Sequence, residues 1–216
     1  AKPAQMAQAR AQLALDQGDS AEAQRQLELL TGSGAKDAWR QFGRVLVTAR
    51  DQALAARLLE ALATPQRLPG DGQAWLAMSE LGEKLGRHAY ALKIADAAVL
   101  RFHSAETYAW AAQMKAKDGD RAGAQELLRK ALAQAPSDTR LRLAYAGLLS
   151  ASGDDAAASR LLAHGTQDAD TYAMRAGLAA RHQDAKALAT LYRQLQQAPP
   201  DVRVQSSYLL GQLAEM

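Results

Sequence analysis

The chain has 216 residues, of which 48% are hydrophobic but only 5% are aromatic, and it contains no cysteine. Its formal net charge is +3, from 26 basic and 23 acidic side chains, without a run of Lys or Arg that could follow a nucleic-acid backbone. This composition excludes disulfides and thiolate metal sites, and no apolar stretch has the length that spans a membrane. Alanine and leucine supply much of the apolar content, so the sequence predicts an all-α fold without nucleic acid as a partner.

The two ends of the sequence do not have the form of natural termini. The chain opens with AKPAQ, without an initiator methionine or an apolar leader, and it ends at Glu215 and Met216 inside a helical pattern. We therefore expect that a targeting segment, where one exists, lies outside this sequence.

Three similar phrases mark joints between helices. They are QGDSAEAQRQL, DGDRAGAQELL and SGDDAAASRLL, beginning at positions 17, 118 and 152. In each phrase the glycine suits the left-handed conformation just past a helix, and the aspartate after it can cap the first turn of the next helix. Gly119 and Gly153 are 34 positions apart, and Gly18 lies 101 positions before Gly119, close to three such periods. This period of helix, tight turn and helix predicts a repeat array.

The clearest repeat, residues 105–138, resembles the tetratricopeptide repeat (TPR) family. Tyr108 stands at the first aromatic position of the family pattern, Ala112 at its small position and Pro136 at its closing proline. The second-helix positions hold Ala124, Leu128 and Ala131. Two positions depart from the leucine and tyrosine of the family, namely Ala111 and Lys115.

The same template, applied to the whole chain, gives six repeats and one extra helix. The repeats span residues 4–37, 38–71, 72–104, 105–138, 139–168 and 169–202, and the extra helix spans 203–216. The resemblance implies that residues 1–216 form a single right-handed superhelical solenoid of stacked antiparallel helix pairs. One helix pair cannot bury its own apolar stripe, so we expect neighbouring pairs to stabilise one another.

Two joints depart from the repeat. The segment TPQRLPGDG, between Ala63 and Gln73, contains two prolines and two glycines and predicts a longer loop. The fifth repeat lacks the closing proline and has Gly165 where alanine is usual. We therefore expect its second helix to be short and the stack to bend there.

No arrangement of residues indicates catalysis. The four histidines, His88, His103, His164 and His182, lack the spacing of a metal site, and we interpret them as solvated residues of turns. The adjacent acids Asp154 and Asp155 fit a helix cap and a first-turn carboxylate. The sequence therefore predicts a protein that is not an enzyme and that has no cofactor and no metal.

The TPR resemblance implies a concave groove that is lined by the first helix of each repeat and binds a protein or peptide. The groove positions of the family, transferred to this sequence, give eight candidate residues: Arg40, Arg44, Glu80, Trp110, Gln113, Arg140, Met174 and Tyr208. Tryptophan and arginine are enriched at interface hot spots, although Trp110 can equally be a packing residue. Arg40 and Arg44, four residues apart, can bind a carboxylate or face solvent. The chain has no asparagine, which argues against the TPR subtype that clamps a C-terminal carboxylate with Lys and Asn.

The predicted function is a protein-binding scaffold or adaptor. The Ala-, Gln- and Arg-rich style is similar to bacterial TPR proteins of the cell envelope, including lipoprotein adaptors of proteases and scaffolds of export complexes. This similarity favours the periplasm or envelope over the cytoplasm, and such an adaptor would act by tethering. One alternative is a regulatory or oligomerisation segment of a longer enzyme or transcription factor. The other is self-association through the C-terminal helix, with an uncovered apolar face at Leu209, Leu210 and Leu213.

Overall fold

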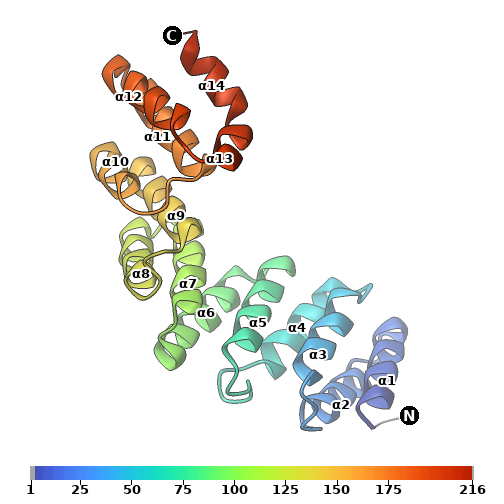
Figure 1. Cartoon of the computed structure of the whole chain (residues 1–216). Helices are drawn as coiled ribbons and strands as arrows, with labels where there is room; N and C mark the ends of the chain where they lie inside the picture. The colour runs from blue at the N-terminus through green and yellow to red at the C-terminus, as the bar shows by residue number, and fades with distance from the viewer. Residues whose placement is uncertain (1–2, 216) are drawn as a thin grey trace. The chain divides into compact units, whose positions relative to one another are not determined.

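A computed structural model describes residues 3–215 as a series of helices joined by short turns (Figure 1). The first seven are α1 (Pro3–Gln17), α2 (Ser20–Thr31), α3 (Ala38–Val47), α4 (Gln52–Leu62), α5 (Gly72–Lys84), α6 (His88–Phe102) and α7 (Ala105–Lys117). The next seven are α8 (Arg121–Gln134), α9 (Thr139–Ala151), α10 (Asp155–Ala163), α11 (Ala169–Arg181), α12 (Ala185–Gln196), α13 (Pro200–Gln205) and α14 (Ser207–Ala214). Residues 3–215 contain no strand, and the predicted all-α fold of helix pairs is confirmed.

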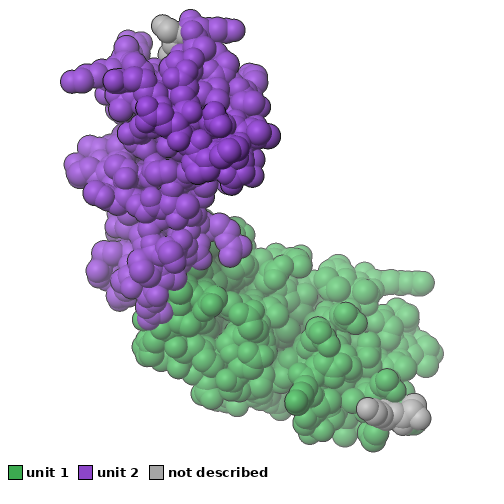
Figure 2. All heavy atoms as spheres, viewed as in Figure 1, with its two compact units in different colours: residues 1–118 green, residues 119–216 purple. Residues whose placement is uncertain are grey.

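The chain divides into two compact units, residues 1–118 and 119–216 (Figure 2). The boundary falls inside the fourth predicted repeat, directly after α7. The single solenoid over the whole chain stays a prediction, and each unit is described by itself below.

Unit 1 is a stack of helix pairs in which the first helix of each pair contacts the first helix of the next pair. The first helices contact one another in order, α1 with α3, α3 with α5 and α5 with α7, and the second helix α2 contacts α4. One apolar cluster runs through the unit and includes Leu27, Phe42, Leu59, Trp75 and Ile94. Because each pair covers the apolar face of the next, short helices that would be marginal alone become stable.

Unit 2 repeats this arrangement. The helix α9 contacts α11, and α11 contacts α13, while α10 packs on α9 and α12 on α11. Two apolar clusters hold the unit together. One includes Ala146, Ala158 and Leu162, and the other includes Tyr172, Leu188 and Leu195.

The predicted joints have the expected geometry. Gly18, Gly119 and Gly153 have φ values of 74°, 90° and 87°. In each case the next residue, an aspartate, accepts a hydrogen bond from the backbone N–H three residues further on, at 2.8 to 3.0 Å. The joint between α11 and α12 has the same form with Gln183 at φ 54°, a position that the sequence did not reveal because glutamine gives no signal for a left-handed residue.

The predicted long loop and the predicted short second helix of the fifth repeat are both present, while the bend of the stack stays a prediction. Residues 63–71 form the long loop between α4 and α5, and α10 has only 9 residues. The loop is held at both ends, because Trp75 Nε1 donates to the Pro69 carbonyl and the Tyr90 hydroxyl donates to the Ala63 carbonyl, each at 2.7 Å. Burial raises the pKa of Tyr90 above its ordinary value, so this hydroxyl remains a donor.

Gly165, which replaces the usual alanine, lies against a buried arginine. Its φ is 98°, and a Cβ atom there would overlap the guanidinium of Arg142. Arg142 is only 6% exposed and donates to the Pro136 carbonyl. The glycine is therefore required by both the backbone conformation and the space that Arg142 occupies.

The C-terminal segment differs from the prediction of one helix over 203–216. The helix α13 begins at Pro200, whose fixed φ suits a first turn, and the chain then breaks at Ser206 before α14. The predicted uncovered apolar face is wrong. Leu213 is buried and Leu209 and Leu210 pack against the α11–α12 core, because α14 folds back onto α12. Met216 lies outside the described residues.

Within residues 3–215, no helix combines the length and the apolar character needed to cross a bilayer.

Candidate protein-binding groove

Three of the predicted binding residues meet in one groove of unit 1. Arg40 and Arg44 on α3 and Glu80 on α5 line a hollow of about 890 Å³ between these two helices. Residues before each helix also line the hollow, namely Lys36 and Asp37 before α3 and Pro69 before α5. Residues from two different predicted repeats are thus brought together, because consecutive first helices lie side by side.

Small residues shape the floor of the groove. A Cβ atom on Gly43 of α3 would lie 3.4 Å from Met78 Cε of α5, so the glycine lets the two helices come close. Ala74 and Ala77 of α5 also line the groove and add little bulk. The floor is therefore apolar and open to a side chain from outside.

Apolar side chains continue up the α3 wall. Trp39 is half-buried and packs against Phe42, with ring centroids 5.3 Å apart. Val47, at the end of α3, leaves 45% of its surface exposed. An exposed valine beside a half-buried tryptophan offers apolar contact area to a partner.

Some of the charged side chains that line the groove form ion pairs with one another. Arg40 forms an ion pair with Asp37 at 3.7 Å, and Lys84 pairs with Glu80 at 2.8 Å. Both pairs are exposed to solvent and contribute little to stability. The guanidinium of Arg44 is exposed and has no ion pair among residues 3–215.

Trp110 has a packing role. Its side chain is half-buried, and its Nε1 donates to Ser79 Oγ at 2.8 Å. Ser79 is fully buried and donates in turn to the Ala91 carbonyl at 2.6 Å. Through Ser79, Trp110 on α7 is therefore linked to both α5 and α6. Gln113, one turn further along α7, is exposed.

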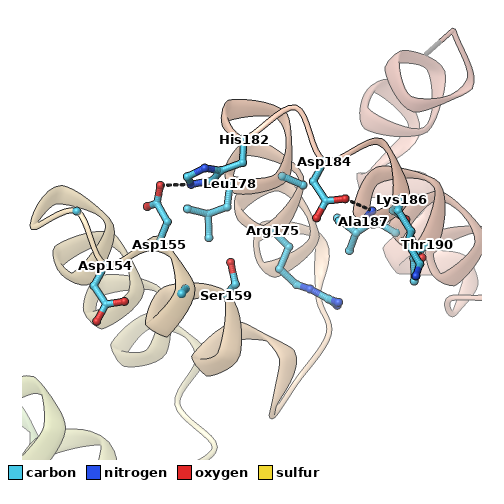
Figure 3. Close-up of a pocket in the computed structure, with 14 residues that line it drawn as sticks. Asp154, Asp155, Ser159, Arg175, Leu178, His182, Asp184, Lys186, Ala187 and Thr190 are labelled. Atoms are coloured by element: carbon cyan, nitrogen blue, oxygen red, sulfur yellow. Dashed lines mark hydrogen bonds and ion pairs between the residues drawn. The ribbon is translucent and has the colours of Figure 1, made fainter.

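The three predicted residues of unit 2 lie apart from the hollow of that unit. Arg140 on α9 is exposed, and Met174 on α11 is half-buried against the cluster that contains Ala146. Tyr208 on α14 is 78% exposed. None of the three lines the hollow shown in Figure 3.

The hollow of unit 2, about 720 Å³, lies between α10, α11 and α12 (Figure 3). His182, directly after α11, reaches Asp155 at the start of α10, with 2.6 Å between Nε2 and Oδ2. Ser150 and His182 lower the pKa of the Asp155 carboxyl, and Arg181 lies 3.6 Å from its other oxygen. Arg175 donates to Gln167 at 2.5 Å. The contact between His182 and Asp155 joins the turn after α11 to the start of α10, which favours a structural role.

His182 lies in the turn after α11 with 59% of its side chain exposed, as predicted, although its Nε2 also contacts Asp155. His88 departs from the prediction, because it is the first residue of α6 and its Nδ1 lies 2.6 Å from Glu83 Oε1 on α5. That contact depends on how α5 and α6 pack, which the local sequence does not reveal. Among residues 3–215, no three side chains of the types that bind metals come together.

Comparison with known proteins identifies the repeat. A tetratricopeptide repeat family model matches residues 115–181. No curated protein sequence matches the chain.

Solved structures share the fold at low sequence identity. The structure of MamA, residues 41 to the end, from Desulfovibrio magneticus RS-1 is 17% identical, with a TM-score of 0.51 over 76% of this chain and 93% of that chain. The structure of PilF from Pseudomonas aeruginosa is 19% identical, with a TM-score of 0.51 over 98% of this chain and 100% of that chain. Residues 115–181 are therefore tetratricopeptide repeats, and the chain has the helix-pair fold of this family.

Proposed function

We propose that this protein is a non-catalytic scaffold that binds a protein partner in the groove between α3 and α5. The tetratricopeptide fold itself indicates a protein–protein interaction scaffold. The observation that supports this particular site is the meeting of Arg40, Arg44 and Glu80, which the repeat pattern assigned to a binding face, around an apolar floor. Such a scaffold acts by raising the local concentration of its partner near other bound molecules.

The groove has the composition of an interface. It combines an aromatic residue, arginines and exposed apolar surface, which are the features that carry most binding energy at protein interfaces. Its side chains sit on two helices that pack directly on each other, so the surface is preformed.

A filled groove provides the test. Ala77 is exposed on the α5 side of the groove, so Ala77→Trp fills the hollow without entering the core. Ala53 is exposed on α4 and does not line the groove, which makes Ala53→Trp the matched control. Partners are captured by chemical crosslinking from cell extracts with the wild type and both variants, after circular dichroism shows that all three are folded.

Partners retained by the wild type and by Ala53→Trp but lost with Ala77→Trp are the expected result. Equal capture by all three proteins contradicts a site in this groove, and a partner lost only with Ala53→Trp places binding on the second helices.

A further inference from the structure

We propose that the α3–α5 groove selects a peptide segment in which an aspartate or glutamate stands close to an apolar side chain. This inference rests on the proposed function, since it names the chemistry of the partner at the same groove.

The acidic side chains of the groove are already occupied. Asp37 accepts from Gln41 at 2.5 Å and pairs with Arg40, and Asp71 caps the start of α5 through the Gln73 N–H at 3.0 Å. Glu80 is paired with Lys84, as described above. Among residues 3–215, Asp71 is therefore the one of these three carboxylates without an ion pair to a basic side chain.

Two basic side chains of the groove have no acidic partner. Within residues 3–215, neither Arg44 nor Lys36 forms an ion pair, and both line the hollow and are exposed. A guanidinium beside an apolar floor binds a carboxylate through two parallel hydrogen bonds, which are stronger than neutral ones. The uncompensated charge of the groove is therefore positive and is centred on Arg44 and Lys36.

Apolar surface lies within one helical turn of Arg44. Val47 follows Arg44 by three residues, a spacing that places both on one face of α3. Val47 is 45% exposed, and Ala77 and Met78 face the same hollow from α5. A segment whose carboxylate meets Arg44 thus brings its neighbouring side chains against an apolar surface.

The same charges disfavour a nucleic-acid backbone. A polyanion laid along the groove would bring a phosphate close to Asp71, which lines the hollow without an ion pair in the described part of the chain. One carboxylate can approach Arg44 without this repulsion. A single acidic residue within a partly apolar peptide is therefore the occupant that the charges fit.

A display library of random peptides tests this chemistry. The library is selected on the full chain, and each enriched peptide is synthesised and measured by fluorescence anisotropy. The variant is Arg44→Glu, and the control is Arg57→Glu, an equal charge reversal at an exposed residue of α4 outside the groove. Peptides that bind the wild type but not Ala77→Trp are identified as those that use the groove.

The expected peptides contain Asp or Glu beside an apolar residue. Their affinity falls about tenfold or more with Arg44→Glu or when the peptide acid is changed to its amide, as the loss of one charged hydrogen-bonded pair predicts, and it changes little with Arg57→Glu.

Each other outcome overturns a defined statement. Groove-binding peptides without acidic residues overturn this inference and leave the proposed function standing, whereas no groove-dependent peptide at all overturns the proposed function. Equal losses with Arg44→Glu and Arg57→Glu show an effect of net charge and overturn the pairing with Arg44. Sedimentation that shows a wild-type dimer dissociated by Ala77→Trp identifies a second copy of this chain as the occupant and also overturns the inference.

Discussion

The indole Nε1 of Trp110 donates a 2.8 Å hydrogen bond to Ser79 Oγ. Ser79 lies 31 positions earlier, on the first helix of the preceding pair. Since Ser79 also donates to the Ala91 carbonyl, one hydroxyl links α5, α6 and α7. The link satisfies a serine that has no contact with solvent, as buried polar groups require.

Ser79→Ala is expected to destabilise unit 1. It leaves the half-buried indole N–H without its acceptor, which costs about 1–3 kcal/mol in the free energy of unfolding. The measurement is urea unfolding followed by circular dichroism, for Ser79→Ala, Trp110→Phe and the double variant. A coupling energy of about 0.5–1.5 kcal/mol between the two positions is expected, and strictly additive losses would show that the bond does not contribute.

Gly82→Ala is also expected to destabilise the protein, although alanine favours helices. A Cβ atom at Gly82 of α5 would lie 2.7 Å from Tyr90 Cδ1 of α6, so the Tyr90 ring or the two helices would have to move, at a cost of about 1–3 kcal/mol. The matched control is Gly177→Ala on α11, where a Cβ atom meets nothing within 4 Å. That control is expected to gain about 0.5–1 kcal/mol. Thermal melts in which both variants shift in the same direction would contradict the close approach of α5 and α6.

The joint at Gln183 predicts a stabilising substitution. Gln183 has a left-handed backbone, φ 54°, which costs a residue with a side chain about 1–2 kcal/mol, whereas glycine adopts this conformation freely. Gln183→Gly should therefore raise the free energy of unfolding by up to about 1 kcal/mol, because the greater entropy of glycine in the unfolded chain offsets part of the gain. The reverse change at the equivalent joint, Gly153→Gln, should cost about 1–2 kcal/mol. A loss of stability on Gln183→Gly would mean that its side chain contributes more than the backbone conformation costs.

Glu83 predicts a pH-dependent contribution to stability. A hydrogen bond from Lys117 and then one from His88 lower the pKa of Glu83 below its ordinary value of 4.5, and only 16% of its side chain is exposed. Because the folded state lowers this pKa, its contribution is complete above pH 4.5 and is lost as the pH falls through the lowered value. The difference in free energy of unfolding between the wild type and Glu83→Gln, measured by urea unfolding, should therefore shrink in acid. A difference that is the same at neutral and acidic pH would remove Glu83 from this role.

Much of the fold could be predicted because its signals are local. At three joints, such as Gly18 and Asp19, the glycine predicts the left-handed backbone and the aspartate predicts the helix cap. Gln183 carries no such signal, and only the cap at Asp184 marks that joint. The buried position of Leu213 was missed for a different reason, because the pattern did not predict the turn at Ser206 that brings α14 onto α12.

The site could be predicted where its residues occupy positions that recur on the same face of successive first helices. Arg44 and Glu80 stand at equivalent positions of consecutive first helices, each five residues after a tryptophan, and Arg40 lies one turn before Arg44, so the template was sufficient to group them. Trp110 stands at another groove position of the template, but its hydrogen bond to Ser79 depends on packing between helix pairs. Val47 and Ala77 were not predicted, because an exposed valine and an exposed alanine become part of a site only when two helices place them around one hollow.

The positions of the tryptophans give the chain an internal fluorescent label. All three, Trp39, Trp75 and Trp110, lie in residues 1–118, and residues 119–216 contain none. Tryptophan emission, excited at a wavelength that tyrosine does not absorb, therefore records the unfolding of unit 1 alone, while circular dichroism records both units. The separation between the two melting curves measures how far the units unfold independently. Trp39 lines the groove, so a peptide that enters it also changes the emission of the unmodified protein.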